Sequence, residues 1–153
     1  MSIRQTLDDL GIILPALAGP FGAYVPARRE GNFVFVSGQL PMKEGKLLAV
    51  GQVPSRCTVE QAKKAAEQCV INALAAVATL GPDAIANLTG VLRVGAFVSS
   101  DSSFTAQPQI ANGASELLLK IFGDAGKHVR AAVGTNTLPL DAAVEIEFVF
   151  VTK

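Results

Sequence analysis

Residues 127–153 read KHVRAAVGTNTLPLDAAVEIEFVFVTK, and this stretch decides how the rest of the chain can fold. Two strand-like runs flank a turn that contains glycine, asparagine and proline. In the second run alternate residues are apolar and would share one face of a sheet, namely Val144, Ile146, Phe148 and Phe150. The opposite face begins with Glu145 and Glu147. Because Arg130 lies in the first run, we expect Arg130 and Glu145 to lie on adjacent strands.

The rest of the chain divides into predicted strands and helices. The expected elements are, in order, a short helix over residues 1–15, a short strand over 23–27, a turn over 28–32, a strand from Phe33 to Val36, a helix from Thr58 to about Leu80, a strand from Leu88 to Val98, a second helix that ends at Gly123, and the two final strands. Omitting the short helix, the order β-β-α-β-α-β-β predicts an α+β fold, with a single mixed sheet and two helices packed on one face.

Local signals predict where the two long helices begin. Thr58 and Gln61 fit a capping box at the start of the first helix. Asp101, with Ser102 or Ser103, can cap the second helix, because short polar side chains accept hydrogen bonds from the first free backbone amides.

Two predicted strands are apolar on both faces, although the helices can cover only one face. Phe33–Val36 is continuously apolar, which is typical of a strand buried on both sides. The face of the last strand that begins with Glu145 ends with Val149 and Val151. Since the chain offers no third layer, we expect a second copy of the chain to cover this face in a homo-oligomer.

Composition excludes several classes of protein. The chain has 153 residues, enough for one domain, with 50% hydrophobic and only 17% charged residues. Its formal net charge of zero gives no basic footprint for nucleic acid. Neither a signal peptide nor an apolar run of membrane length is found, and Cys57 and Cys69 do not form a disulfide framework. We therefore expect a cytoplasmic protein that binds neither nucleic acid nor membrane.

The charged residues of the last two strands admit two interpretations. Arg130 and Glu145 could form a structural ion pair across strands. Alternatively, Arg130 could bind the carboxylate of a ligand through two parallel hydrogen bonds, while Glu145 orients or deprotonates a water molecule. His128 is the single histidine and has no acidic cluster beside it in the sequence, so we expect no metal site.

Two further positions suggest a pocket. Gly38 removes side-chain bulk at the end of a strand, where another group can approach the backbone. Tyr24 is either a half-buried strand residue or a phenol at a loop edge that reaches a pocket.

Four segments together resemble the reactive-intermediate deaminase superfamily, also called the YjgF family. These segments are Gly22-Ala23-Tyr24; Phe35 to Pro41, with the Ser-Gly-Gln block; Ala111-Asn112 with Glu116; and Arg130 to Val133 with Leu138-Pro139 and Val144 to Glu147. The resemblance covers roughly residues 21–153, so residues 1–20 are expected to be an N-terminal extension. Ala132 stands where one branch of the family often has cysteine, and residues 42–56 form a longer connection.

The resemblance implies a chorismate-mutase-like fold and a homotrimer with pockets between subunits. It also implies hydrolysis of small 2-imino or enamine acids to keto acids and ammonia, without metal or cofactor. Arg130 and Glu145 would be catalytic, with Arg130 holding the substrate carboxylate and Glu145 positioning the water. The substrate-binding residues would be Tyr24, Ser37, Gly38, Asn112 and Arg130.

Three other functions stay open at this point. A trimeric module that binds a small carboxylate metabolite without turnover would need Arg130 but not Glu145. RNA cleavage is disfavoured by the neutral charge and the single histidine. Chorismate mutase activity would rest on fold analogy alone.

Overall fold

A computed structural model describes residues 1–17 and 22–153. Its elements are, in order, α1 (Ile3–Asp9), β1 (Ala27–Glu30), β2 (Phe33–Gln39), β3 (Met42–Lys43), β4 (Lys46–Leu47), α2 (Val59–Ala78), β5 (Leu88–Ser99), α3 (Gln107–Phe122), the 3-10 turn η1 (Gly123–Gly126), β6 (Val129–Thr135), the 3-10 turn η2 (Pro139–Asp141) and β7 (Val144–Thr152). The expected boundary between residues 20 and 21 lies outside the described residues.

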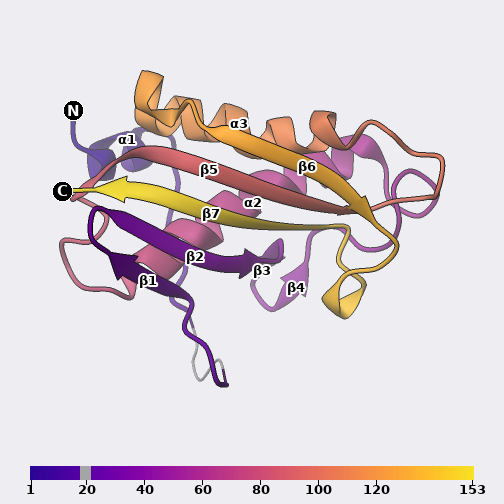
Figure 1. The fold of residues 1–153 in the computed structure, drawn as a ribbon, viewed down its shortest axis with the longest axis horizontal. Helices are drawn as coiled ribbons and strands as arrows, with labels where there is room; N and C mark the ends of the chain where they lie inside the picture. The colour runs from indigo at the N-terminus through magenta and orange to yellow at the C-terminus, as the bar shows by residue number, and fades with distance from the viewer. Residues whose placement is uncertain (18–21) are drawn as a thin grey trace.

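Five strands form one mixed sheet in the order β1-β2-β7-β5-β6. The β5–β6 pair is parallel, and the other neighbours are antiparallel. Helix α2 crosses behind β2 and β7, and α3 lies along β5 and β6, so both helices cover the same face (Figure 1). This is the predicted α+β arrangement. The short β3–β4 hairpin lies within the connection expected between residues 42 and 57.

Helix α2 begins at the predicted capping box. Thr58 Oγ1 accepts a hydrogen bond from the Gln61 amide at 3.1 Å, and the Thr58 amide donates to Gln61 Oε1 at 3.0 Å. Its inner face carries small, fully buried residues such as Ala62 and Ala73, which let the helix approach the sheet closely. The helix ends at Ala78, two residues before the expected end.

The start of α3 differs from the prediction. Helix α3 begins at Gln107 after Ala106, which supplies no side-chain cap. Asp101 accepts hydrogen bonds from the amide and hydroxyl of Ser55, at 2.9 and 2.8 Å. The Asp101 carboxylate therefore holds the loop before α2 in place. Because both of its oxygens accept from Ser55, it does not cap α3. Gly123 ends α3 as predicted, with φ of 60°.

The first strand is displaced along the sequence. The structure places β1 at residues 27–30, most of which were expected to form a turn, and the segment over 23–26 is irregular. Ala27 pairs with Val36 and Glu30 with Phe33, so only Gly31 and Asn32 remain to turn the chain. Gly31 has φ of 58°, which allows this tight two-residue turn.

The short N-terminal helix is part of the packed structure. Ser2 caps α1 by accepting a hydrogen bond from the Gln5 amide at 3.1 Å. Leu7 is 4% exposed and belongs to the hydrophobic core. Ile12 and Leu14 also pack against that core. No helix in residues 1–17 and 22–153 is long and apolar enough to cross a membrane.

The sheet face opposite the helices is open in the single chain. Val34 and Val36 point into the core, whereas Phe33 and Phe35 are 40% and 50% exposed. Strand β2 is thus buried on one face only within one chain. The expected burial of this strand on both faces is therefore not seen within one chain, and a second copy that covers the open face stays a prediction.

Candidate functional site

Glu145 lies against Gly38, at the point where β2 and β7 change register. The pairing shifts between Val36 and Gln39. A Cβ atom at Gly38 would lie 3.0 Å from Glu145 Cδ and 3.1 Å from Oε2. The carboxyl group is therefore the group that approaches this backbone, and the missing side chain makes room for it.

Glu145 has the environment of an acid–base group. It is half-buried on the open face of the sheet. Burial, and then the negative charge of Glu147, raise the pKa of Glu145 above the ordinary range of glutamate. A carboxyl group whose pKa is shifted towards neutrality can both accept and return a proton.

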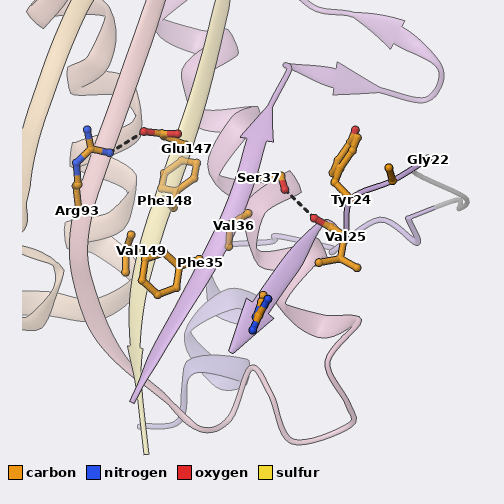
Figure 2. Close-up of a pocket in the computed structure, with 12 residues that line it drawn as sticks. Gly22, Tyr24, Val25, Phe35, Val36, Ser37, Arg93, Glu147, Phe148 and Val149 are labelled. Carbon is orange, nitrogen blue, oxygen red and sulfur yellow. Dashed lines mark hydrogen bonds and ion pairs between the residues drawn. The ribbon is translucent and has the colours of Figure 1, made fainter. Parts of the chain in front are cut away.

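Tyr24 and Ser37 lie close to Gly38, the residue against which this carboxyl group packs. Ser37 Oγ donates a hydrogen bond to the Val25 carbonyl at 2.7 Å, which ties the segment before β1 to β2 (Figure 2). Tyr24 is 61% exposed, as a loop-edge phenol would be, and not a half-buried strand residue. Tyr24, Ser37 and Gly38 line one groove of about 550 Å³.

Arg130 and Asn112 form a second group of predicted residues. Arg130 Nη1 donates to Asn112 Oδ1 at 2.8 Å and to Ser115 Oγ at 3.1 Å. Both partners are uncharged, and among the described residues no carboxylate pairs with Arg130. The Nε and Nη2 groups have no partner in that part of the chain. One edge of the guanidinium is thus held, and the other keeps its donors and its full positive charge for a ligand.

The structure separates Arg130 from Glu145, so the expected adjacency of their strands is wrong. Strand β5 lies between β6 and β7, which puts the two strands about 10 Å apart. Arg130 is level with the core residue Val94 and points towards the helices. Glu145 points to the opposite face. The ion pair between them is also excluded within one chain, because Arg130 bonds to Asn112 and Ser115 instead.

The ion pair on the open face is made by Arg93, which sequence reasoning missed. Arg93 Nη1 lies 2.8 Å from Glu147 Oε1 (Figure 2). A Cβ at Gly95 would lie 2.7 Å from Arg93 Nη1, so this glycine leaves space for the pair. Arg93, Glu147, Tyr24 and Phe35 line a groove of about 940 Å³ across the face. One signal could have indicated it, because Arg93 is a lone arginine inside an apolar strand.

Sequence reasoning also missed Ser115. Its spacing of three from Asn112 places both residues on one face of α3, which could have indicated a shared partner. Ser115 Oγ lies 2.9 Å from His128 Nε2, and His128 Nδ1 lies 2.6 Å from the Gly126 carbonyl oxygen.

The cysteines take no part in either group. Cys69 is completely buried on α2, and burial raises the pKa of its thiol far above the usual range, which keeps it un-ionised. Cys57 is also buried and free. Among the described residues, no group of three or more histidine, cysteine, aspartate or glutamate side chains could hold a metal ion.

The chain is similar in sequence to known proteins over almost its whole length. Residues 5–152 match the family model described as "YjgF/chorismate mutase-like, putative endoribonuclease". Protein TCP17 of Trypanosoma cruzi is 39% identical over 147 residues, which are 95% of this chain and 91% of that protein. A RutC family protein of Pyrococcus abyssi is 27% identical, over 84% of this chain and 85% of its own.

A solved structure shows the same fold over nearly the whole length. The crystal structure of Atu1372 from Agrobacterium tumefaciens, a protein of unknown function, superposes with a TM-score of 0.89. It is 39% identical in sequence, and the match covers 99% of this chain and 94% of that one.

Proposed function

Because the chain belongs to the YjgF/chorismate mutase-like family, we propose that it hydrolyses small 2-imino acids, or their enamine tautomers, to 2-keto acids and ammonia. The observation that carries this proposal is the state of Arg130. Its guanidinium is anchored by neutral groups on Nη1, while Nε and Nη2 are available for a carboxylate. A 2-imino acid presents such a carboxylate next to the carbon that must be attacked.

The reaction needs one water molecule and one group that handles a proton. Water attacks the electrophilic imine carbon while ionised Glu145 accepts a proton from it. Glu145 returns that proton to the nitrogen, which gives the carbinolamine. Glu145 then accepts the hydroxyl proton of the carbinolamine and passes it to the amino group, so that the carbon–nitrogen bond breaks, ammonia leaves and the carbon becomes a ketone. Glu145 suits both steps because its raised pKa brings the acid and carboxylate forms closer in energy at neutral pH. No cofactor takes part in this scheme.

We place the complete site between two subunits of a homotrimer. Arg130 lies on β6, which is an edge strand, and its neighbour Val129 is 66% exposed. Glu145 lies on the open sheet face beside Gly38. A second copy packed against that face would cover Phe35 and bring its own β6 to the carboxyl group, because an exposed edge and an exposed apolar face both favour association.

The proposal is tested by measuring ammonia and keto acid released from freshly generated 2-iminopropanoate. We expect catalysis by the wild-type protein, a large loss for Arg130→Ala through KM, and a loss of about a hundredfold or more in kcat for Glu145→Gln. Arg29→Ala is a matched control, since this exposed arginine donates to the Gly31 and Lys153 carbonyl oxygens and lines neither of the two grooves described above. Equal rates for the wild-type protein and Arg130→Ala would remove the proposal.

Binding without turnover is the second candidate, and the same arginine favours it. The clamp formed by Arg130 needs no help from Glu145, so a pure binding protein would keep its affinity for pyruvate in Glu145→Gln. Calorimetry on that variant, beside an assay that never detects ammonia from the wild-type protein, would favour the binding function.

A further inference from the structure

His128, Ser115 and Arg130 form a chain of hydrogen bonds that ends at the proposed carboxylate clamp. The His128 ring bridges the Gly126 carbonyl oxygen, 2.6 Å from Nδ1, and Ser115 Oγ, 2.9 Å from Nε2. Ser115 Oγ in turn lies 3.1 Å from Arg130 Nη1. The three side chains come from different elements: α3, the segment before β6, and β6 itself.

With a neutral His128 ring, the partners fix the direction of every hydrogen bond in this chain. A carbonyl oxygen only accepts, so Nδ1 of His128 carries the proton that is donated to Gly126. A guanidinium only donates, so Ser115 Oγ accepts from Arg130. The hydroxyl hydrogen of Ser115 is then left to donate to Nε2 of His128, which accepts in this tautomer. Each group thus donates or accepts in the one way that gives both of its neighbours a hydrogen-bond partner.

From this arrangement we infer that Ser115 and His128 are positioning residues for Arg130, an inference that rests on the proposed carboxylate clamp. Asn112 alone holds the guanidinium at one point. Ser115, itself held in place by His128, is a second acceptor on the same Nη1 and so fixes the plane of the guanidinium, with its Nε and Nη2 donors. Bidentate binding of a carboxylate depends on that plane, so the fixed plane lowers the ordering cost of binding.

Neutral anchors suit this role better than a carboxylate would. The charged residues close in sequence to Arg130 and Ser115 form ion pairs with other residues. Lys127 pairs with Asp124 at 3.0 Å, and Glu116 pairs with Lys63 at 3.4 Å. Asn112 and Ser115 therefore orient Arg130 without neutralising it, and its charge remains for the ligand.

The test compares Ser115→Ala, which removes the acceptor, with Ser115→Thr, which keeps a hydroxyl. We expect the Kd for pyruvate and the KM for 2-iminopropanoate to rise about three- to tenfold in Ser115→Ala, the effect of one lost hydrogen bond, with kcat changed less than twofold. Ser115→Thr restores both constants. His128→Phe behaves like Ser115→Ala. Ser103→Ala, in the exposed loop before α3, is the matched control.

A merely structural role gives a different pattern. It would lower the melting temperature and the active fraction while leaving KM and Kd at wild-type values, and that result would overturn the inference. If the wild-type protein binds pyruvate but releases no ammonia, the proposed deamination fails, and the Kd values alone decide the role of Ser115.

The rotation rate of the Arg130 guanidinium, measured without ligand, tests the inference even if no carboxylate binds. The Nη resonances of Arg130 in NMR spectra report how fast the guanidinium rotates. We expect slow rotation in the wild-type protein and Ser115→Thr, and fast rotation in Ser115→Ala. Equal rotation in all three proteins would overturn the inference.

Discussion

Substitution of Gly38 by alanine tests whether the space beside this residue serves Glu145. The new Cβ would lie 3.0 Å from Glu145 Cδ and 3.2 Å from Cγ. Carbon atoms pack at about 3.5 Å or more, so the carboxyl group must retreat by roughly 0.5 Å. The obstacle is the end of a flexible side chain, and we expect the free energy of unfolding to fall by only about 1 kcal/mol.

The catalytic cost should be much larger than the cost in stability. Displacing a proton-handling group by this amount is expected to lower kcat for imine hydrolysis about ten- to a hundredfold. The added methyl group also removes solvent from Glu145, so the acid limb of the pH–rate profile should move to higher pH. Steady-state assays of ammonia release between pH 4 and pH 9 would measure both effects.

A double-mutant cycle identifies the residue through which Gly38→Ala acts. In a Glu145→Gln background the same substitution should cost little further activity, because the group it displaces no longer handles a proton. The reasoning is refuted if Gly38→Ala keeps the wild-type kcat, or if its loss of activity is undiminished in the Glu145→Gln background.

Other predictions concern the charges on the open face. Glu147→Gln removes a negative neighbour that raises the pKa of Glu145, so the acid limb of the pH–rate profile should move to lower pH; an unchanged limb would contradict this. Because the pKa of Glu145 is raised in the folded state, its ionisation costs stability as pH rises through that value. Glu145→Gln should therefore raise the melting temperature more at pH 8 than at pH 4, and a pH-independent difference would speak against a raised pKa of Glu145 in the folded state. Gly95→Ala places a Cβ 2.7 Å from Arg93 Nη1 and should break the ion pair with Glu147, lowering the free energy of unfolding by about 1 kcal/mol in urea titrations.

Features with strong local causes could be predicted from the sequence. The capping box of Thr58 and Gln61, the end of α3 at Gly123 and the alternation in β7 all depend on residues close in the chain. The mixed sheet with two helices on one face followed from the order of these elements.

Features decided by distant partners could not be predicted. Asp101 is a residue type that often caps helices, but its carboxylate binds Ser55, which is 46 residues away. Arg130 and Glu145 lie on strands that follow one another in the sequence. In the sheet, however, β5 lies between these two strands and separates the two residues. Periodicity assigns residues to faces of a strand, whereas the order of strands in a sheet depends on the packing of the whole chain.

Mixing two inactive variants tests most directly whether one site is built from two chains. Arg130→Ala and Glu145→Gln would be unfolded together in equal amounts and refolded, with each variant refolded alone as the control. If Arg130 of one copy serves Glu145 of another, about a quarter of the sites regain both residues, and ammonia release should return to about a quarter of the wild-type rate. A mixture as inactive as each variant alone, with mixed oligomers confirmed by native mass spectrometry, would contradict the shared site.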